Sequence, residues 1–158
     1  GQDGDFTWER FEERYNADLA NNLGNLVSRV AVMATKYRAG RVAPAPGAVS
    51  HLTERAADVV RRYQAAMDEH QLHVGMAAAF ELVDATNEFI TRSEPWVLAK
   101  DPTRAAELDQ ALFDMAEALR IAALLLWPAI PTSASDILRR VGETRPADAL
   151  RVPRDTAW

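Results

Sequence analysis

Asn25 and Arg29 are the residues of this chain whose types and spacing best suit recognition of another molecule. On a helix, residues at positions i and i+4 lie on one face, so these two would offer a planar amide beside a planar guanidinium. That pair can hydrogen-bond the edge of an exposed nucleic-acid base. Asn21, Asn22 and Gly24 precede them, although these residue types cost about 0.5 to 1 kcal/mol each against Ala inside a helix. Function therefore explains this polar face, with an ordinary solvated helix face as the alternative.

Pro95, Trp96 and Lys100 form a second candidate site. Proline fits the first turn of a helix because its missing N–H would be unpaired there, and it fixes the direction of the next side chain. Trp96 then lies one turn from Lys100, which suits stacking of an unpaired base beside a neutralised phosphate. A tryptophan that caps the end of a helical bundle is the alternative.

Basic residues gather in one part of an acidic chain with a net charge of −5. No acidic residue lies between Asp18 and Glu54, a window that holds Arg29, Lys36, Arg38 and Arg41. A local basic patch suits contact with phosphates, because Coulomb attraction is screened beyond about 10 Å. Attraction of Lys36 and Arg38 to the C-terminal end of a helix dipole is the alternative.

The chain offers few groups for metal binding or catalysis. It contains no cysteine, which excludes thiolate zinc sites and a cysteine nucleophile. Its histidines are His51, His70 and His73, and none follows a glutamate by three residues as in di-iron bundles. Neither a glycine-rich phosphate loop nor a nucleophile elbow is found. We therefore predict no metal, no cofactor and no catalytic residue within this chain.

Asn87 interrupts the apolar series Phe80, Val83 and Ile90. A buried amide without partners would cost a few kcal/mol, so we expect its hydrogen bonds to be satisfied. We interpret Asn87 as a core amide that ties two helices together. A place on the recognition surface is the alternative.

Apolar spacing of three and four residues predicts an all-α fold, an antiparallel helical bundle of four to five helices. Short connections should make consecutive helices antiparallel neighbours. We expect residues 1–142 to form the bundle and residues 143–158 a C-terminal tail that packs on it or leaves it. No apolar run approaches the ~20 residues of a membrane span, so we expect a cytoplasmic protein. The predicted helices cover residues 7–37 with a bend near Asn16, 52–71, 76–90, 108–126 and 132–141.

Four segments together resemble the C-terminal anticodon-binding domain of methionyl-tRNA synthetases, which are class I aminoacyl-tRNA synthetases. They are Gly1–Phe6, Arg14–Leu26, Glu94–Lys100 and Leu126–Ala134, so the resemblance covers essentially the whole chain. It implies the helical bundle of that family and, as partner, the anticodon loop of methionine tRNA.

The resemblance also implies roles for single residues. Those that match Asn25, Arg29 and Trp96 recognise the CAU anticodon, with Pro95 beside the tryptophan. Lys36 and Lys100 are candidate phosphate contacts, while Arg38 and Arg41, in a variable part of the family, receive no individual role.

The catalytic domain of the family, which uses ATP with Mg and methionine, lies upstream and is absent from this chain. The resemblance therefore predicts a recognition domain that works as an enzyme only together with that upstream domain. A helical protein-interaction module on the same scaffold is the main rival, and a freestanding bundle enzyme is a third possibility without a supporting motif.

Overall fold

A computed structural model describes residues 19–143, 145, 149–152 and 154–158. The predicted bend near Asn16 and the start of the first helix lie outside these residues. Within them no strand is found, and the predicted all-α class is confirmed. The helices are the π-helical turn η2 (Leu19–Leu23), α2 (Gly24–Arg38), α3 (Thr53–Asp68), α4 (Leu72–Ser93), α5 (Pro95–Leu98), α6 (Ala105–Leu126) and α7 (Pro131–Arg140), with short 3₁₀ turns at Pro102–Arg104 and Arg154–Thr156.

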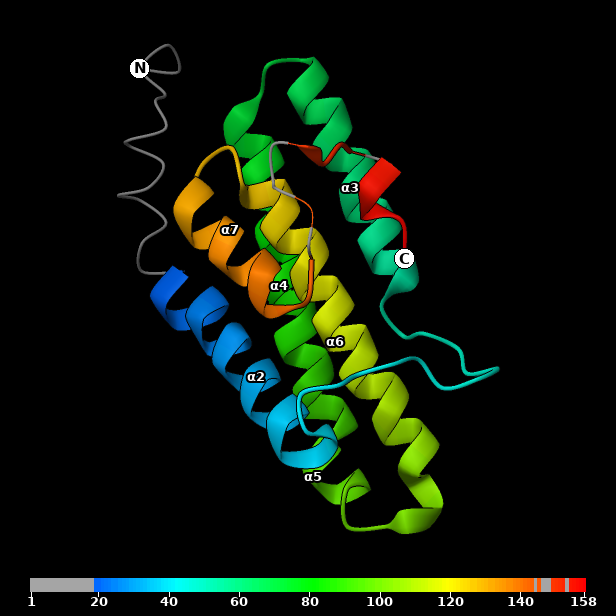
Figure 1. Ribbon diagram of the computed structural model, residues 1–158. Helices are drawn as coiled ribbons and strands as arrows, with labels where there is room; N and C mark the ends of the chain where they lie inside the picture. The colour runs from blue at the N-terminus through cyan, green and yellow to red at the C-terminus, as the bar shows by residue number, and fades with distance from the viewer. Residues whose placement is uncertain (1–18, 144, 146–148, 153) are drawn as a thin grey trace.

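The five long helices of the described chain form an up-and-down bundle around α6. Helices α2, α4 and α7 run in one direction and α3 and α6 in the other (Figure 1). Helix α6 packs against α2, α3, α4, α5 and α7, and α3 packs most extensively against α4. The antiparallel bundle predicted from the sequence is therefore confirmed.

The apolar series that predicted the helices form the core. Leu26, Val30 and Met33 of α2 are buried, and nearly every residue of α6 from Leu108 to Leu126 is buried or half-buried. Full burial of one such aliphatic side chain contributes roughly 1.5 to 3 kcal/mol. Because α6 is apolar on almost every side, it occupies the centre, and the more amphipathic helices surround it.

Helices α2 and α3 depart from the expectation that consecutive helices are close neighbours. Their connection is long, and it crosses the face of α6 in Figure 1, so both helices pack on α6 instead. The buried side chain of Gln110 accepts from the N–H of Ala45 at 3.0 Å, and the buried carboxylate of Asp114 accepts from the N–H of His51 at 3.2 Å. Two polar side chains of α6 thus fix a loop that the sequence pattern had left undefined.

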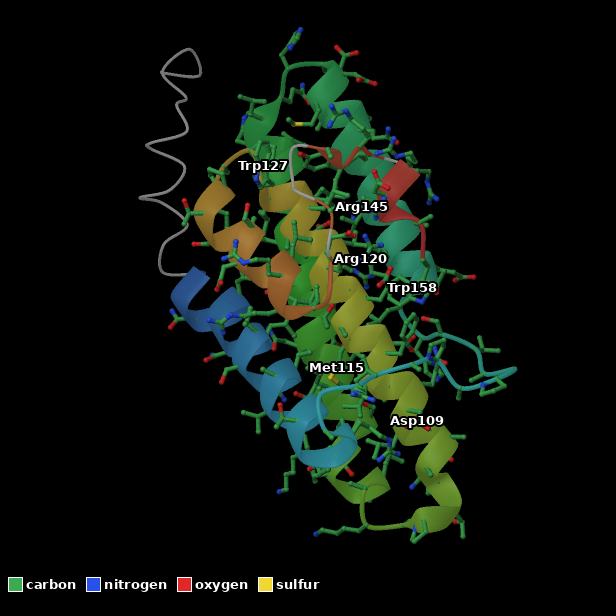
Figure 2. All side chains as sticks on the ribbon, viewed as in Figure 1. Asp109, Met115, Arg120, Trp127, Arg145 and Trp158 are labelled. Carbon is green, nitrogen blue, oxygen red and sulfur yellow. The ribbon has the colours of Figure 1, made fainter. Side chains whose placement is uncertain are left out.

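The described part of the C-terminal segment packs on α6. Leu150 and Asp155 are buried, and the guanidinium of Arg120 donates to the C=O of Asp155 at 2.7 Å and to that of Ala157 at 3.2 Å. Arg145, labelled with Arg120 in Figure 2, donates to the carboxylate of Asp155 at 2.6 Å.

Among the described helices, none is long and apolar enough to cross a membrane.

Candidate nucleic-acid interface

A polar pocket of about 390 Å³ lies between the middle of α4 and the segment formed by η2 and the first turns of α2. Its walls are amides, a hydroxyl, a carboxylate and one guanidinium, and it holds no apolar side chain. The lining residues are Asn21, Asn22, Asn25, Ser28, Arg29, Asp84 and Asn87. The pocket therefore suits a ligand with both hydrogen-bond donors and acceptors.

Asn25 and Arg29 both line this pocket, as their spacing predicted. The Nδ2 of Asn25 donates to the C=O of Asn21, and its Oδ1 accepts no hydrogen bond within the described residues. The Nη1 of half-buried Arg29 donates to the Oδ1 of Asn87 at 3.2 Å, its sole hydrogen bond or ion pair in the part of the chain that is described. One free acceptor and several free donors therefore remain for a ligand.

Asn87 satisfies its amide as expected, but it does so at the edge of the pocket. It is half-buried, and its Nδ2 donates to the C=O of Asn22 at 3.1 Å. The interpretation that Asn87 ties two helices together is confirmed by these bonds to residues 22 and 29. Asn87 also lines the polar pocket, so a tie between helices and a place on the pocket wall do not exclude each other.

Sequence reasoning named Asn21 and Asn22 as part of the functional polar face, but it missed Asp84 and Ser28 as pocket residues. The Nδ2 of Asn22 donates to Oδ1 of Asp84 at 3.0 Å, so a carboxylate lies beside the amides. The available signal was the i, i+3 spacing of Asp84 and Asn87, which places both on one face of a helix.

Pro95 and Trp96 follow the single residue that separates α4 from α5. Glu94 has a φ of +46°, in the left-handed region, and buried Pro95 then opens the single turn of α5. The side chain of Trp96 is 41% exposed, so part of its ring is open to a stacking partner. Trp96 does not line the polar pocket. Instead, α5 packs on α6, at the end of the bundle where α2 also ends (Figure 1).

The basic residues of α2 separate into different roles. Lys36 is exposed, two turns beyond Arg29 on the same helix, with its Nζ 5.6 Å from the ring centre of Tyr37. Arg38 forms an ion pair with Asp109 of α6 and donates to the C=O of Tyr37 at 2.6 Å, which makes it a structural tie. Lys100 is exposed just after α5. Lys36 and Lys100 are thus both exposed, and so is Arg92 just before the second candidate site.

His51 lies apart from His70 and His73, which are both at the turn between α3 and α4. His51 stacks on Phe89 at 6.1 Å between ring centres, and His70, with a φ of +57°, lies beyond the end of α3. No group of three or more potential metal ligands occurs among the described residues.

Two sequence families match different parts of the chain. Residues 41–155 match the "Anticodon binding domain of methionyl tRNA ligase", and residues 1–31 match "tRNA synthetases class I (M)". The methionine–tRNA ligase of Bacillus subtilis is 40% identical over 148 residues, which are 91% of this chain and 22% of that protein. The corresponding ligase of Enterococcus faecalis is 38% identical over 146 residues, again 22% of its length. The chain thus spans about a fifth of the curated relatives that it matches.

Solved structures of methionyl-tRNA synthetases also match this chain. The free methionyl-tRNA synthetase of Mycobacterium tuberculosis superposes with a TM-score of 0.80 at 31% identity, covering 96% of this chain and 31% of that one. The same enzyme bound by methionyl-adenylate gives a TM-score of 0.72 at 34% identity over 82% of this chain and 27% of that one. With its helical bundle and the matched residues 41–155, this chain belongs to the family of anticodon-binding domains of methionyl-tRNA ligases.

Proposed function

We propose that this chain binds the CAU anticodon stem-loop of methionine tRNA. The observation that carries the proposal is the polar pocket between α2 and α4, where Asn25 and Arg29 meet with free hydrogen-bonding groups. An unpaired base presents donors and acceptors on its edge, which an amide acceptor and guanidinium donors can match. Family membership supports the same role.

The candidate residues divide the work by their chemistry. Asn25 and Arg29 read base edges, because hydrogen bonds depend on which base is present. Trp96, directed by Pro95, offers a stacking face that accepts any base. Lys36 and Lys100 contribute long-range attraction to phosphates, which carries no sequence information.

We further propose that this recognition supports methionylation of tRNA by an upstream catalytic domain of the same protein. The match of residues 1–31 to the class I synthetase family supports such a connection. That domain would use ATP with Mg and methionine. A protein with this role works in the cytoplasm, where tRNA is charged.

Binding of a panel of anticodon stem-loops tests the proposal. One loop carries CAU, and the others are altered at one anticodon position each. We expect Asn25→Ala and Arg29→Ala to weaken CAU binding about tenfold, since each hydrogen bond to a charged or amide group contributes roughly 1 to 2 kcal/mol. Both variants should also lose part of the preference for CAU.

Arg139→Ala is the matched control for this panel. Arg139 is an exposed arginine on α7 that pairs with Asp136 at 3.1 Å, outside the polar pocket. Its removal should leave the preference for CAU unchanged. Equal and weak binding of every loop by the parent protein would contradict the proposal and favour a protein-interaction module on the same scaffold.

A further inference from the structure

We propose that Asn87 is a positioning residue of this site, which holds the guanidinium of Arg29 in the orientation that reads a base. The inference rests on the proposed function and adds to it a residue on a different helix. Asn87 comes from α4, whereas Asn25 and Arg29 come from α2.

The amide of Asn87 has a defined orientation because both of its ends are used. Its Oδ1 accepts from Nη1 of Arg29 at 3.2 Å, and its Nδ2 donates to the C=O of Asn22 at 3.1 Å. Rotation of the amide by 180° would place an NH₂ group against the guanidinium and an oxygen against the carbonyl, so both bonds would be lost. The acceptor offered to Arg29 is therefore held in place by the backbone of α2 itself.

A neutral partner suits an arginine that must still bind RNA. A carboxylate at position 87 would also hold the guanidinium, but it would neutralise the charge that attracts phosphates and bases. Arg38, on the same helix, is bound by the carboxylate of Asp109 in this way. Within the described residues Arg29 forms no ion pair and its other N–H groups are unbonded, although the carboxylate of Asp84 lines the same pocket.

Fixing Arg29 before binding also reduces the conformational entropy that is lost on binding. A free arginine side chain samples many rotamers, and a ligand that must immobilise such a side chain binds more weakly. A second contact holds the start of α2 to α4, because Nδ2 of Asn22 donates to Asp84 at 3.0 Å. Asn22 is thus bonded to α4 through both its main chain and its side chain. Asn87, which accepts from Arg29, is one of the two residues of α4 that make these bonds.

The test is the ratio of affinities for the CAU stem-loop and for a loop altered at one anticodon position. It is measured for the parent chain, Asn87→Ala, Arg29→Ala and the double variant. We expect Asn87→Ala to lower the ratio about three- to tenfold, the equivalent of one hydrogen bond. In the Arg29→Ala background Asn87→Ala should lower the ratio no further, because Asn87 acts through Arg29.

Two further variants separate positioning from a loss of stability. Thr86 is fully buried next to Asn87 and does not line the pocket, so Thr86→Ala lowers stability by removing buried side-chain atoms and leaves the pocket unchanged. Its affinity ratio should equal that of the parent. Asn87→Asp keeps an acceptor for Arg29 but loses the bond to the C=O of Asn22, so it should retain more of the ratio than Asn87→Ala does, while the added negative charge weakens both loops alike.

Circular dichroism confirms that each variant remains folded. A parental ratio in Asn87→Ala, together with a lowered ratio in Arg29→Ala, would overturn the positioning role and leave the proposed function intact. A further loss in the double variant would also overturn it, because Asn87 would then contact the RNA directly. Parental ratios in both Arg29→Ala and Asn25→Ala would contradict the proposed function itself.

Discussion

Two arginines of α2 show how the partner of a side chain decides its role. Arg29 is bonded to a neutral amide and remains a cation that a ligand can use. Arg38 is bonded to the carboxylate of Asp109 and to the C=O of Tyr37, which fixes the end of α2 on α6. Both residues lie in the same acid-free window of the sequence, so charge counting could not separate them.

Trp96 is the residue whose loss should reduce affinity without reducing selectivity. Trp96→Ala removes a stacking platform that contributes roughly 1 to 3 kcal/mol per base, so binding of every stem-loop should weaken about tenfold or more. Titration of the same stem-loop panel measures this. Trp127→Phe is the control, because Trp127 is half-buried against the core and its Nε1 donates to Ser135 at 3.2 Å. Parental binding by folded Trp96→Ala would mean that Trp96 only caps the bundle.

At the scale of elements, the loop between α2 and α3 is held by a buried polar network. Gln110 donates from Nε2 to the carboxylate of Asp114 at 2.8 Å, and each side chain also accepts from a backbone N–H of the loop. Burial raises the pKa of Asp114 above its usual range, although the hydrogen bonds from His51, Gln110 and Ser50 act against this rise. The ionised carboxylate is therefore a cost to folding that its partners only partly offset.

This raised pKa predicts a pH dependence of stability with a definite sign. A carboxyl group whose pKa is higher in the folded state stabilises the fold most below its unfolded value of 3.8, and this stabilisation is lost as the pH rises through the folded pKa. The free energy of unfolding of the parent, minus that of Asp114→Asn, should therefore increase as the pH falls from 7 to below that value. Urea denaturation of both proteins over this pH range measures this difference in the free energy of unfolding. The other carboxylates are present in both proteins, so their contributions cancel. A difference independent of pH would contradict the prediction.

At the scale of the whole molecule, Arg120 connects α6 to the C-terminal segment. Its side chain is only 12% exposed, and it pairs with Glu117 at 2.6 Å while donating to the carbonyls of Asp155 and Ala157. Hydrogen bonds from Arg154, the N–H of Arg151 and Arg145 lower the pKa of Asp155, and Arg145 likewise lowers the pKa of Glu143. The network therefore joins segments that are far apart in the sequence.

Loss of Arg120 should destabilise the molecule substantially. Arg120→Met leaves Glu117 and two carbonyls without their partner, and we expect the free energy of unfolding to fall by about 2 to 4 kcal/mol. Arg139→Met is the control, since Arg139 forms an exposed ion pair with Asp136 and its loss should cost less than about 0.5 kcal/mol. Chemical denaturation followed by circular dichroism measures both. Equal stabilities of the two variants would show that the C-terminal segment contributes little to the fold.

The sequence by itself determined the helices, their buried faces and the family resemblance. The spacing of Leu26, Val30 and Met33 depends on helix geometry alone, and so does the shared face of Asn25 and Arg29. Only the tertiary structure decided that Asn87 holds Arg29, that Gln110 holds Ala45 and that Arg120 holds the C-terminal segment. The physical reason is that helical periodicity reports contacts within about one turn of the chain. A hydrogen bond between distant residues depends instead on how the helices pack.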